Sequence, residues 1–265
     1  MKTRVISALV LLAIVIPIIV IGKLPFQIFT FVIALMGLKE FLNIKSTKKE
    51  IPVFIEFICY ISLVLIMLLT SSSDLTLSID YRMLCALFLT FLIPTVLYHD
   101  RSIYSVNDAF YLIGGILFLG ISFSLLILLR NEGLATLLYL ICISMFTDTF
   151  AYITGYFIGR NKLIESVSPN KTIEGMIGGT LMAVFIGTIF YNAALDPTTP
   201  LHVVVFVTTF LSILGQLGDL VFSAIKRYFG LKDFSNLIPG HGGILDRLDS
   251  IIFVALGFMF FISII

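Results

Sequence analysis

Long apolar stretches follow one another along almost the whole chain, separated by short polar segments. Each is about as long as the roughly 20 residues that a helix needs to cross the hydrocarbon core of a membrane. A helix also satisfies its own backbone polar groups in lipid. The pattern therefore predicts an all-α, polytopic integral membrane protein with about nine transmembrane helices. The predicted spans lie near residues 5–22, 25–43, 51–70, 80–98, 108–129, 134–158, 172–192, 201–222 and 247–265.

Composition supports this class. Hydrophobic residues make up 59% of the 265 residues and charged residues only 12%, and the mean hydropathy is +1.10, which excludes an ordinary soluble domain. The first span resembles a signal peptide, but it is long, contains Pro17 and lacks a small-x-small cleavage site, so we interpret it as a helix. A net charge of +1 and evenly spread basic residues give no sign of nucleic-acid binding.

The distribution of Lys and Arg predicts the orientation in the membrane. Nine spans put the two termini on opposite sides. With the N-terminus in the cytoplasm, the inner side receives 14 Lys and Arg residues and the outer side only Lys23, Arg82 and Arg130. This asymmetry follows the positive-inside rule. We therefore expect a cytoplasmic N-terminus and an external C-terminus.

We divide the chain into an N-terminal three-helix region (1–72), a central region with helices four and five (73–132), and a catalytic region with helices six to nine (133–265). The last region includes a cytoplasmic loop at 223–245. Pro94 is expected to kink the fourth span. The three cysteines lie inside spans without CxxC spacing, so we expect buried apolar side chains rather than disulfides or a zinc site. They are Cys59, Cys85 and Cys142.

The sixth span carries a polar face. Asp148, Tyr152, Gly155 and Gly159 recur at helical spacing on one side. A carboxylate inside a span is costly in lipid, so it must face protein, water or a cation. This face is either a close helix–helix contact or the wall of a polar cleft.

A second polar segment begins the next span. Ser168 has the character of a helix cap, with Pro169 at the first helical position. Such a terminus can bind an anion, and Lys171 and Thr172 would assist. Capping without any ligand is an equally good interpretation.

The third polar set lies where the eighth span ends and the ninth begins. One face of the eighth presents a carboxylate, a hydroxyl and two cations, and the ninth opens with two carboxylates and a hydroxyl. Both groups lie on the predicted cytoplasmic side. In chain order they are Asp219, Ser223, Lys226, Arg227, Asp246, Asp249 and Ser250.

Carboxylates beside cations indicate a metal that is itself bound to phosphates. Mg²⁺ accepts a few protein oxygens and completes its octahedron with water or substrate. Asp219 and Asp246 are placed to share such an ion, and the glycines at 240, 242 and 243 let backbone amides approach phosphates. Two simpler alternatives remain: a basic anchor for anionic lipid headgroups, and a structural ion pair between Asp219 and Lys226.

These residues resemble the signature of phosphatidate cytidylyltransferase, also called CDP-diacylglycerol synthase. The resemblance rests on many positions between 223 and 249, in the order Ser223, Lys226, Arg227, Lys232, Asp233, Ser235, Pro239, His241, Gly242, Gly243, Asp246, Arg247 and Asp249. Upstream, Asp148, Tyr152, Gly155 and the segment 168–175 are also similar to that family. Asn170 and Ile173 depart from it, standing where its members often have Lys and Trp.

The resemblance implies a multi-pass enzyme of the cell (inner) membrane, a homodimer dependent on Mg²⁺, with a second cation left open, and with an active site facing the cytoplasm. Its substrates would be CTP and phosphatidic acid, and its products CDP-diacylglycerol and pyrophosphate. The expected catalytic residues are Asp219, Lys226, Arg227 and Asp246, and the expected metal ligands are Asp219, Asp246 and Asp249. The expected substrate-binding residues are Asp148, Tyr152, Ser168, Lys171, Thr172, Ser223, Lys232, Asp233, His241, Gly242, Gly243 and Arg247.

Two other functions compete with this one. A CTP-dependent lipid kinase of the polyprenol type would transfer the γ-phosphate instead of the nucleotidyl group, but such enzymes lack the full signature at 223–249. An ion-coupled transporter would use Asp148 and Asp219 as coupling carboxylates. Transporters of that kind usually carry interrupted helices in both halves, whereas the polar residues here are confined to the second half.

Overall fold

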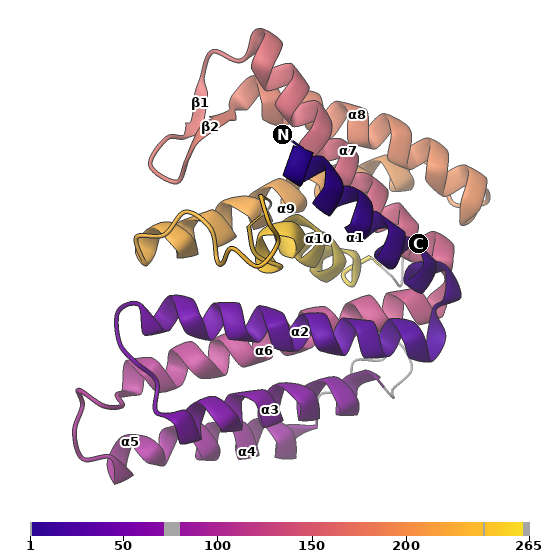
Figure 1. The fold of residues 1–265 in the computed structure, drawn as a ribbon. Helices are drawn as coiled ribbons and strands as arrows, with labels where there is room; N and C mark the ends of the chain where they lie inside the picture. The colour runs from indigo at the N-terminus through magenta and orange to yellow at the C-terminus, as the bar shows by residue number, and fades with distance from the viewer. Residues whose placement is uncertain (1, 72–79, 241, 262–265) are drawn as a thin grey trace. The chain divides into compact units, whose positions relative to one another are not determined.

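The structure is a computed structural model that describes residues 2–71, 80–240 and 242–261 (Figure 1). It consists of helices with one two-stranded sheet, which confirms the predicted all-α class. The elements are α1 (Lys2–Ile21), α2 (Lys23–Ser46), α3 (Val53–Ser71), α4 (Tyr81–Leu92), α5 (Pro94–Leu97), α6 (Val106–Glu132), α7 (Leu134–Ile158), β1 (Lys162–Ile164), β2 (Ser168–Thr172), α8 (Ile173–Ala194), α9 (Leu201–Tyr228) and α10 (Leu245–Phe258).

The first eight predicted spans coincide with helical segments, whereas the ninth, 247–265, is helical as far as Phe258 among the residues described. In the described residues, α2, α3, α6, α7, α8 and α9 are long and apolar enough to cross a membrane, and shorter apolar helices lie at Leu9–Ile21 and Tyr81–Leu97. The fourth span is divided, since α4 ends at Leu92 and α5 begins at Pro94. Proline lacks the N–H that would continue the helical ladder. The expectation of a polytopic membrane protein with a kink at Pro94 is confirmed.

The chain forms two compact units. The first comprises residues 1–131 and 233–245, and the second comprises residues 132–232 and 246–265. The glycine-rich loop before α10 is part of the first unit.

Helix α6 forms the core of the first unit. Sixteen of its residues are buried, and small residues let its neighbours approach closely. A Cβ on Gly115 would lie 2.1 Å from the Phe41 ring of α2, and one on Gly120 would lie 2.7 Å from Ile66 of α3. The rings of Phe41 and Tyr111 stack with centroids 4.6 Å apart. Glycine is therefore required at both positions of α6.

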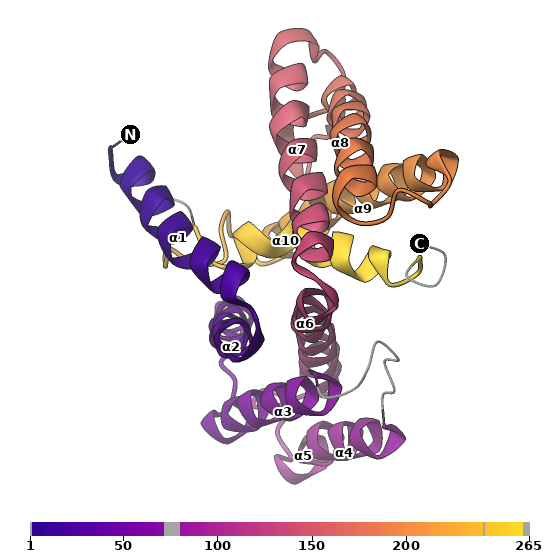
Figure 2. The ribbon, with the colours of Figure 1, turned by 90° about the vertical axis from the view of Figure 1, so that its right-hand side faces the viewer.

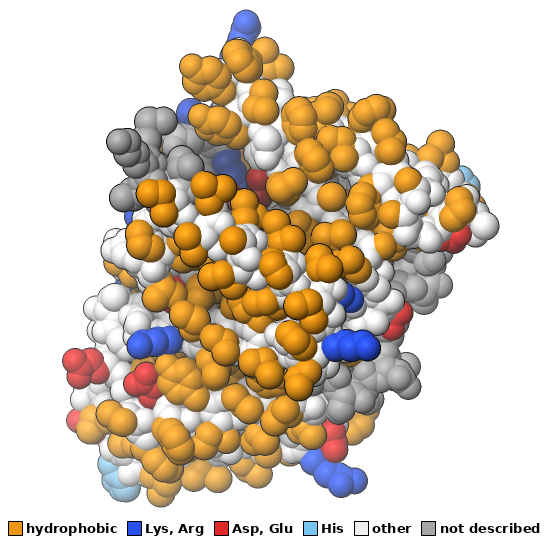
Figure 3. Space-filling model, turned by 45° about the vertical axis from the view of Figure 1, so that its right-hand side comes forward, with side chains coloured by type: hydrophobic (Ala, Val, Ile, Leu, Met, Phe, Trp, Pro, Cys, Tyr) orange, Lys and Arg blue, Asp and Glu red, His pale blue; other side chains and the backbone are white. Residues whose placement is uncertain are grey.

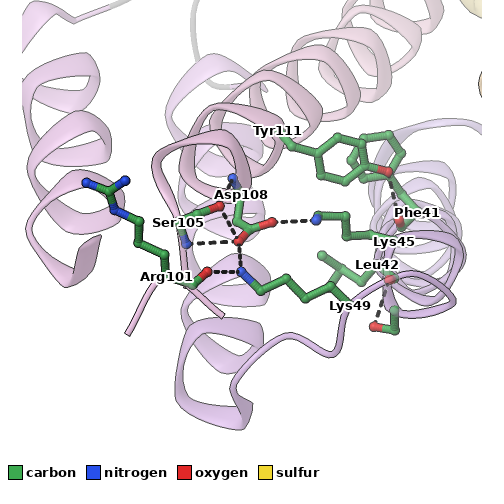
Figure 4. A network of polar contacts seen from close by, with 9 residues as sticks. Phe41, Leu42, Lys45, Lys49, Arg101, Ser105, Asp108 and Tyr111 are labelled. Carbon is green, nitrogen blue, oxygen red and sulfur yellow. Dashed lines mark hydrogen bonds and ion pairs between the residues drawn. The ribbon is translucent and has the colours of Figure 1, made fainter. Parts of the chain in front are cut away.

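A buried polar network joins the end of α2 to the start of α6 (Figure 4). Asp108, 5% exposed, accepts hydrogen bonds from Lys45 and from Lys49. Its Oδ2 also accepts the hydroxyl of Ser105 at 2.7 Å. Because each hydrogen bond to the buried carboxylate is charge-assisted, the network fixes the first turn of α6 against α2.

Helices α7 and α8 of the second unit pack almost backbone to backbone, and Figure 2 shows them side by side. A Cβ on Gly179 would lie 2.5 Å from the carbonyl oxygen of Thr147, and one on Gly175 would lie 2.6 Å from that of Ala151. Small residues commonly allow such approach between membrane helices. Polar side chains then connect to α9, where Thr147 and Ser212 hydroxyls are 2.8 Å apart.

Large hydrophobic side chains are exposed on most of the long helices. They include Ile28 and Val32 of α2, Phe185 and Ile189 of α8, and Phe206 of α9. Figure 3 shows hydrophobic side chains covering most of one face of the molecule, with few charges among them. Such a surface is suited to lipid.

All three cysteines are unpaired. Cys59 is buried and Cys142 is half-buried, but Cys85 is exposed. The expectation of burial is therefore wrong for Cys85, whose position on α4 leaves it on an apolar surface that needs no protein partner.

Candidate active site

Two ion pairs link three segments of the second unit, β2, α9 and α10. The Nζ of Lys171, on β2, lies 2.5 Å from Oδ2 of Asp219 on α9. The Nζ of Lys226, two turns further along α9, donates to Oδ1 of Asp246 on α10 at 2.6 Å. Asp219 and Ser223 lie on the same face of α9, as their spacing predicts, because the Ser223 hydroxyl donates to Oδ1 of Asp219 at 3.3 Å.

Two further carboxylates lie within electrostatic reach of these pairs. Asp148 of α7 interacts with Asp219, Lys171 and the hydroxyl of Ser250. Asp249 of α10 interacts with Asp219, Lys226 and Asp148, and its Oδ1 accepts the backbone N–H of Ser250 at 2.8 Å. We call this set the carboxylate–lysine cluster. Its members are Asp148, Lys171, Asp219, Ser223, Lys226, Asp246, Asp249 and Ser250.

The helix ends help to place these charges. Lys226 lies in the last turn of α9 and Asp246 in the first turn of α10. The helix dipole favours a cation at the C-terminal end of a helix, where Lys226 lies, and an anion at the N-terminal end, where Asp246 lies. The Lys226–Asp246 pair is almost fully buried, with side chains 8% and 3% exposed, whereas Lys171 and Asp219 are 25% and 29% exposed. One pair is thus internal, and the other is open to a ligand.

The cluster contains four carboxylates and two ammonium groups, so acidic groups are in excess. Carboxylate oxygens are donors that Mg²⁺ accepts, and the cluster has no sulfur or imidazole donor for zinc. Within residues 2–71, 80–240 and 242–261, no three His, Cys, Asp or Glu side chains are gathered tightly enough to hold a metal ion by themselves. A cation here would need further oxygen ligands from a substrate.

The segment at 168–172 differs from the prediction. Ser168–Thr172 is a strand that pairs antiparallel with β1, and α8 begins at Ile173. Ser168 is therefore not the helix cap. That role belongs to Thr172, whose Oγ1 accepts the N–H of Gly175 at 3.1 Å. The cause is pairing between strands, which local capping preferences do not include.

The polar face of α7 makes a close helix contact at Gly155 and an electrostatic contact at Asp148. Gly155 packs against Thr172 and Gly175, as a close helix contact requires, while Asp148 interacts with the cluster. Gly159 lies beyond the end of α7 in an extended conformation. Tyr152 is 74% exposed and stacks on Tyr156, so it lies away from the buried part of the cluster.

The remaining predicted site residues are not members of the carboxylate–lysine cluster. Arg227, Lys232 and Arg247 are exposed, and Arg227 donates to the carbonyl oxygen of Leu231 at 2.7 Å. Asp233, Gly242 and Gly243 belong to the first unit. His241 lies outside the described residues.

In the first unit the glycine-rich loop is bound to a residue that the sequence analysis did not select. Glu40 of α2 is 3% exposed and accepts hydrogen bonds from the backbone N–H groups of Ile244 and Leu245. A carboxylate within the predicted span 25–43 is the signal that could have drawn attention to it.

Comparison with known proteins identifies the family of the chain. A model of the Cytidylyltransferase family matches residues 2–265. A phosphatidate cytidylyltransferase of Staphylococcus haemolyticus is 38% identical over 255 residues, covering 96% of each chain. Proteins of the same name from Staphylococcus epidermidis and Staphylococcus aureus are 39% and 38% identical, with the same coverage. The chain therefore belongs to the cytidylyltransferase family.

Proposed function

We propose that this protein transfers the cytidylyl group of CTP to phosphatidic acid, which gives CDP-diacylglycerol and pyrophosphate. The observation that carries the proposal is the carboxylate–lysine cluster. In it, Ser223, Lys226 and Asp246 of the signature meet Asp219, in a chain of this family.

The reaction needs no protein nucleophile. A phosphate oxygen of phosphatidic acid forms a bond to the α-phosphorus of CTP, and the bond from that phosphorus to the oxygen bridging to the β-phosphorus breaks. Pyrophosphate leaves with the electron pair of that bond. The chain contributes positioning and electrostatic stabilisation.

The basic residues divide into two roles. Lys226 is buried against Asp246, so it fixes that carboxylate and supplies positive charge from inside the cluster. Lys171 is partly exposed beside Asp219 and can exchange this partner for a phosphate. Arg227 and Lys232 are exposed and would neutralise phosphates that enter from outside, with Ser223 orienting a phosphate or a water.

Asp219 and Asp246 would hold Mg²⁺, with Asp249 as a weaker ligand, and substrate phosphates would complete the coordination. When bound, the ion would neutralise charge that develops on the phosphate oxygens. The partial exposure of Asp219 supports this proposal, because its side chain is 29% exposed and can be reached by an ion. A second cation is compatible with the excess of carboxylates.

We propose further that the protein lies in the inner membrane of the cell and that its site faces the cytoplasm. We also propose that it forms a homodimer. Support for the orientation comes from the 14 to 3 distribution of Lys and Arg. The homodimer rests on the family resemblance, and crosslinking of the purified protein followed by mass measurement tests it.

The decisive experiment follows labelled CTP with purified protein and phosphatidic acid vesicles. Label from the α-phosphate should enter the lipid fraction, and label from the γ-phosphate should leave as pyrophosphate, in the presence of Mg²⁺ and not of EDTA. Transfer of γ-label to lipid would indicate a lipid kinase and overturn the proposal. Absence of any transfer would do so as well.

A further inference from the structure

Glu40 is a buried carboxylate inside an apolar helix, and among the described residues its side chain accepts hydrogen bonds from one distant loop. Its Oε1 accepts the hydroxyl of Ser235 at 2.6 Å and the N–H of Ile244 at 2.8 Å. Its Oε2 accepts the N–H of Leu245 at 2.9 Å. These donors are separated from Glu40 by 195 to 205 positions along the chain, so tertiary structure alone brings them together.

The loop is shaped around this carboxylate. A Cβ on Gly243 would lie 2.6 Å from Oε1 of Glu40 and 2.7 Å from Oε2. One turn earlier on α2, a Cβ on Gly37 would lie 3.0 Å from the Leu245 side chain. Gly243 is thus needed to make room for the Glu40 carboxylate. The sequence instead suggested that this glycine serves the close approach of phosphates.

The remainder of the loop closes on itself. Gly240 and Gly242 have φ angles of +77° and +85°, which favour glycine. The N–H of Ile238 donates to the carbonyl oxygen of Gly242 at 2.9 Å. The loop is therefore a tight turn held at its two sides, Ser235 and 244–245, by one carboxylate.

Glu40 also caps the helix that follows. Leu245 is the first residue of α10, and the N–H groups of a helical first turn have no partner within the helix. Glu40 accepts one of them from outside the helix and brings a negative charge to the positive end of the helix dipole. Asp246 is the next residue of the chain, so the contact that caps Leu245 also fixes the backbone from which the Asp246 side chain projects.

We infer that Glu40 is a positioning residue, which orders the loop 235–245 and fixes the start of α10, and thereby the place of Asp246. The inference deepens the proposed function and rests on it for the catalytic consequence.

The test uses the full-length protein in lipid nanodiscs, with Glu40→Gln as the conservative variant and Glu40→Ala as the severe one. Glu56→Gln is the matched control, because Glu56 is a half-buried carboxylate on α3 of the same unit that interacts with Tyr60. Hydrogen exchange of the peptide covering 235–245 reports the order of the loop without any need for activity.

Amide exchange in this peptide should accelerate at least about tenfold in Glu40→Ala, since a charge-assisted hydrogen bond is lost. The kcat of cytidylyl transfer should fall roughly 10- to 100-fold, as for a misplaced catalytic group, while KM for CTP changes far less. Glu40→Gln should lie between Glu40→Ala and the wild type, and Glu56→Gln should match the wild type in both measurements.

Unchanged exchange in Glu40→Ala would overturn the inference that Glu40 holds the loop. Faster exchange with normal kcat would overturn its positioning role. If the wild-type protein transferred no cytidylyl group, the proposed function would fail, whereas the exchange result would still decide whether Glu40 orders the loop.

Discussion

The ammonium nitrogen of Lys226 lies 2.6 Å from Oδ1 of Asp246, and the two side chains are 8% and 3% exposed. An internal pair of this kind is costly to break, because the remaining charge stays buried without its counterion. Lys226→Met and Asp246→Asn should each lower the free energy of unfolding by about 3–5 kcal/mol. Thermal or denaturant unfolding in detergent measures this loss.

The double variant is the control for that prediction. Lys226→Met with Asp246→Asn removes both charges, so part of the stability should return and the two single effects should not add. If the two single substitutions lowered the free energy of unfolding only slightly, and their effects added in the double variant, Lys226 and Asp246 would not be energetically coupled.

The Lys171–Asp219 pair is expected to behave differently. Both side chains are about a quarter exposed, and pairs open to solvent contribute no more than about 1 kcal/mol. Asp219→Asn should therefore leave the protein folded, with little change in the free energy of unfolding, but abolish Mg²⁺-dependent cytidylyl transfer. Glu165→Gln, an exposed carboxylate in the turn between β1 and β2, should retain normal transfer. Near-normal activity of Asp219→Asn would refute the metal assignment.

The contact between α7 and α8 should tolerate no side chain at Gly179. An added Cβ meets the Thr147 carbonyl oxygen at 2.5 Å and the Ala151 Cβ at 2.8 Å, and neither can move without shifting a helix. Gly179→Ala should cost about 1–3 kcal/mol of stability, as overpacking does. Gly114→Ala is the matched control, because nothing lies within 4 Å of its added Cβ; there, helix propensity should raise stability by up to about 1 kcal/mol. Equal effects of the two substitutions on the melting temperature would argue against the close contact.

Membrane orientation can be tested with single cysteines in a variant that lacks Cys59, Cys85 and Cys142. Lys232→Cys should react with a membrane-impermeant thiol reagent only after the cells are permeabilised, because 232 is expected on the cytoplasmic side. Pro197→Cys, an exposed position between α8 and α9, should react in intact cells. Labelling of position 232 in intact cells would reverse the predicted topology and separate the site from its cytosolic nucleotide.

The helices could be predicted from the sequence because they depend on local properties. Runs of about 20 apolar residues and the missing N–H of Pro94 act within one segment. The spacing of Asp219, Ser223 and Lys226 likewise follows from helical periodicity alone. Family membership also follows from the order of the residues, without coordinates.

The partners of these residues required the tertiary structure. The sequence suggested a pair between Asp219 and Lys226, whereas the fold pairs Asp219 with Lys171 from a strand and Lys226 with Asp246 from another helix. The strand at 168–172 depends on pairing with 162–164, which outweighs the local preference of Ser168 and Pro169 for a helix start. Glu40 gave the weakest signal of all, one acidic residue among apolar ones. Its role depends on three donors from a loop about 200 positions away, and no local pattern encodes such a contact.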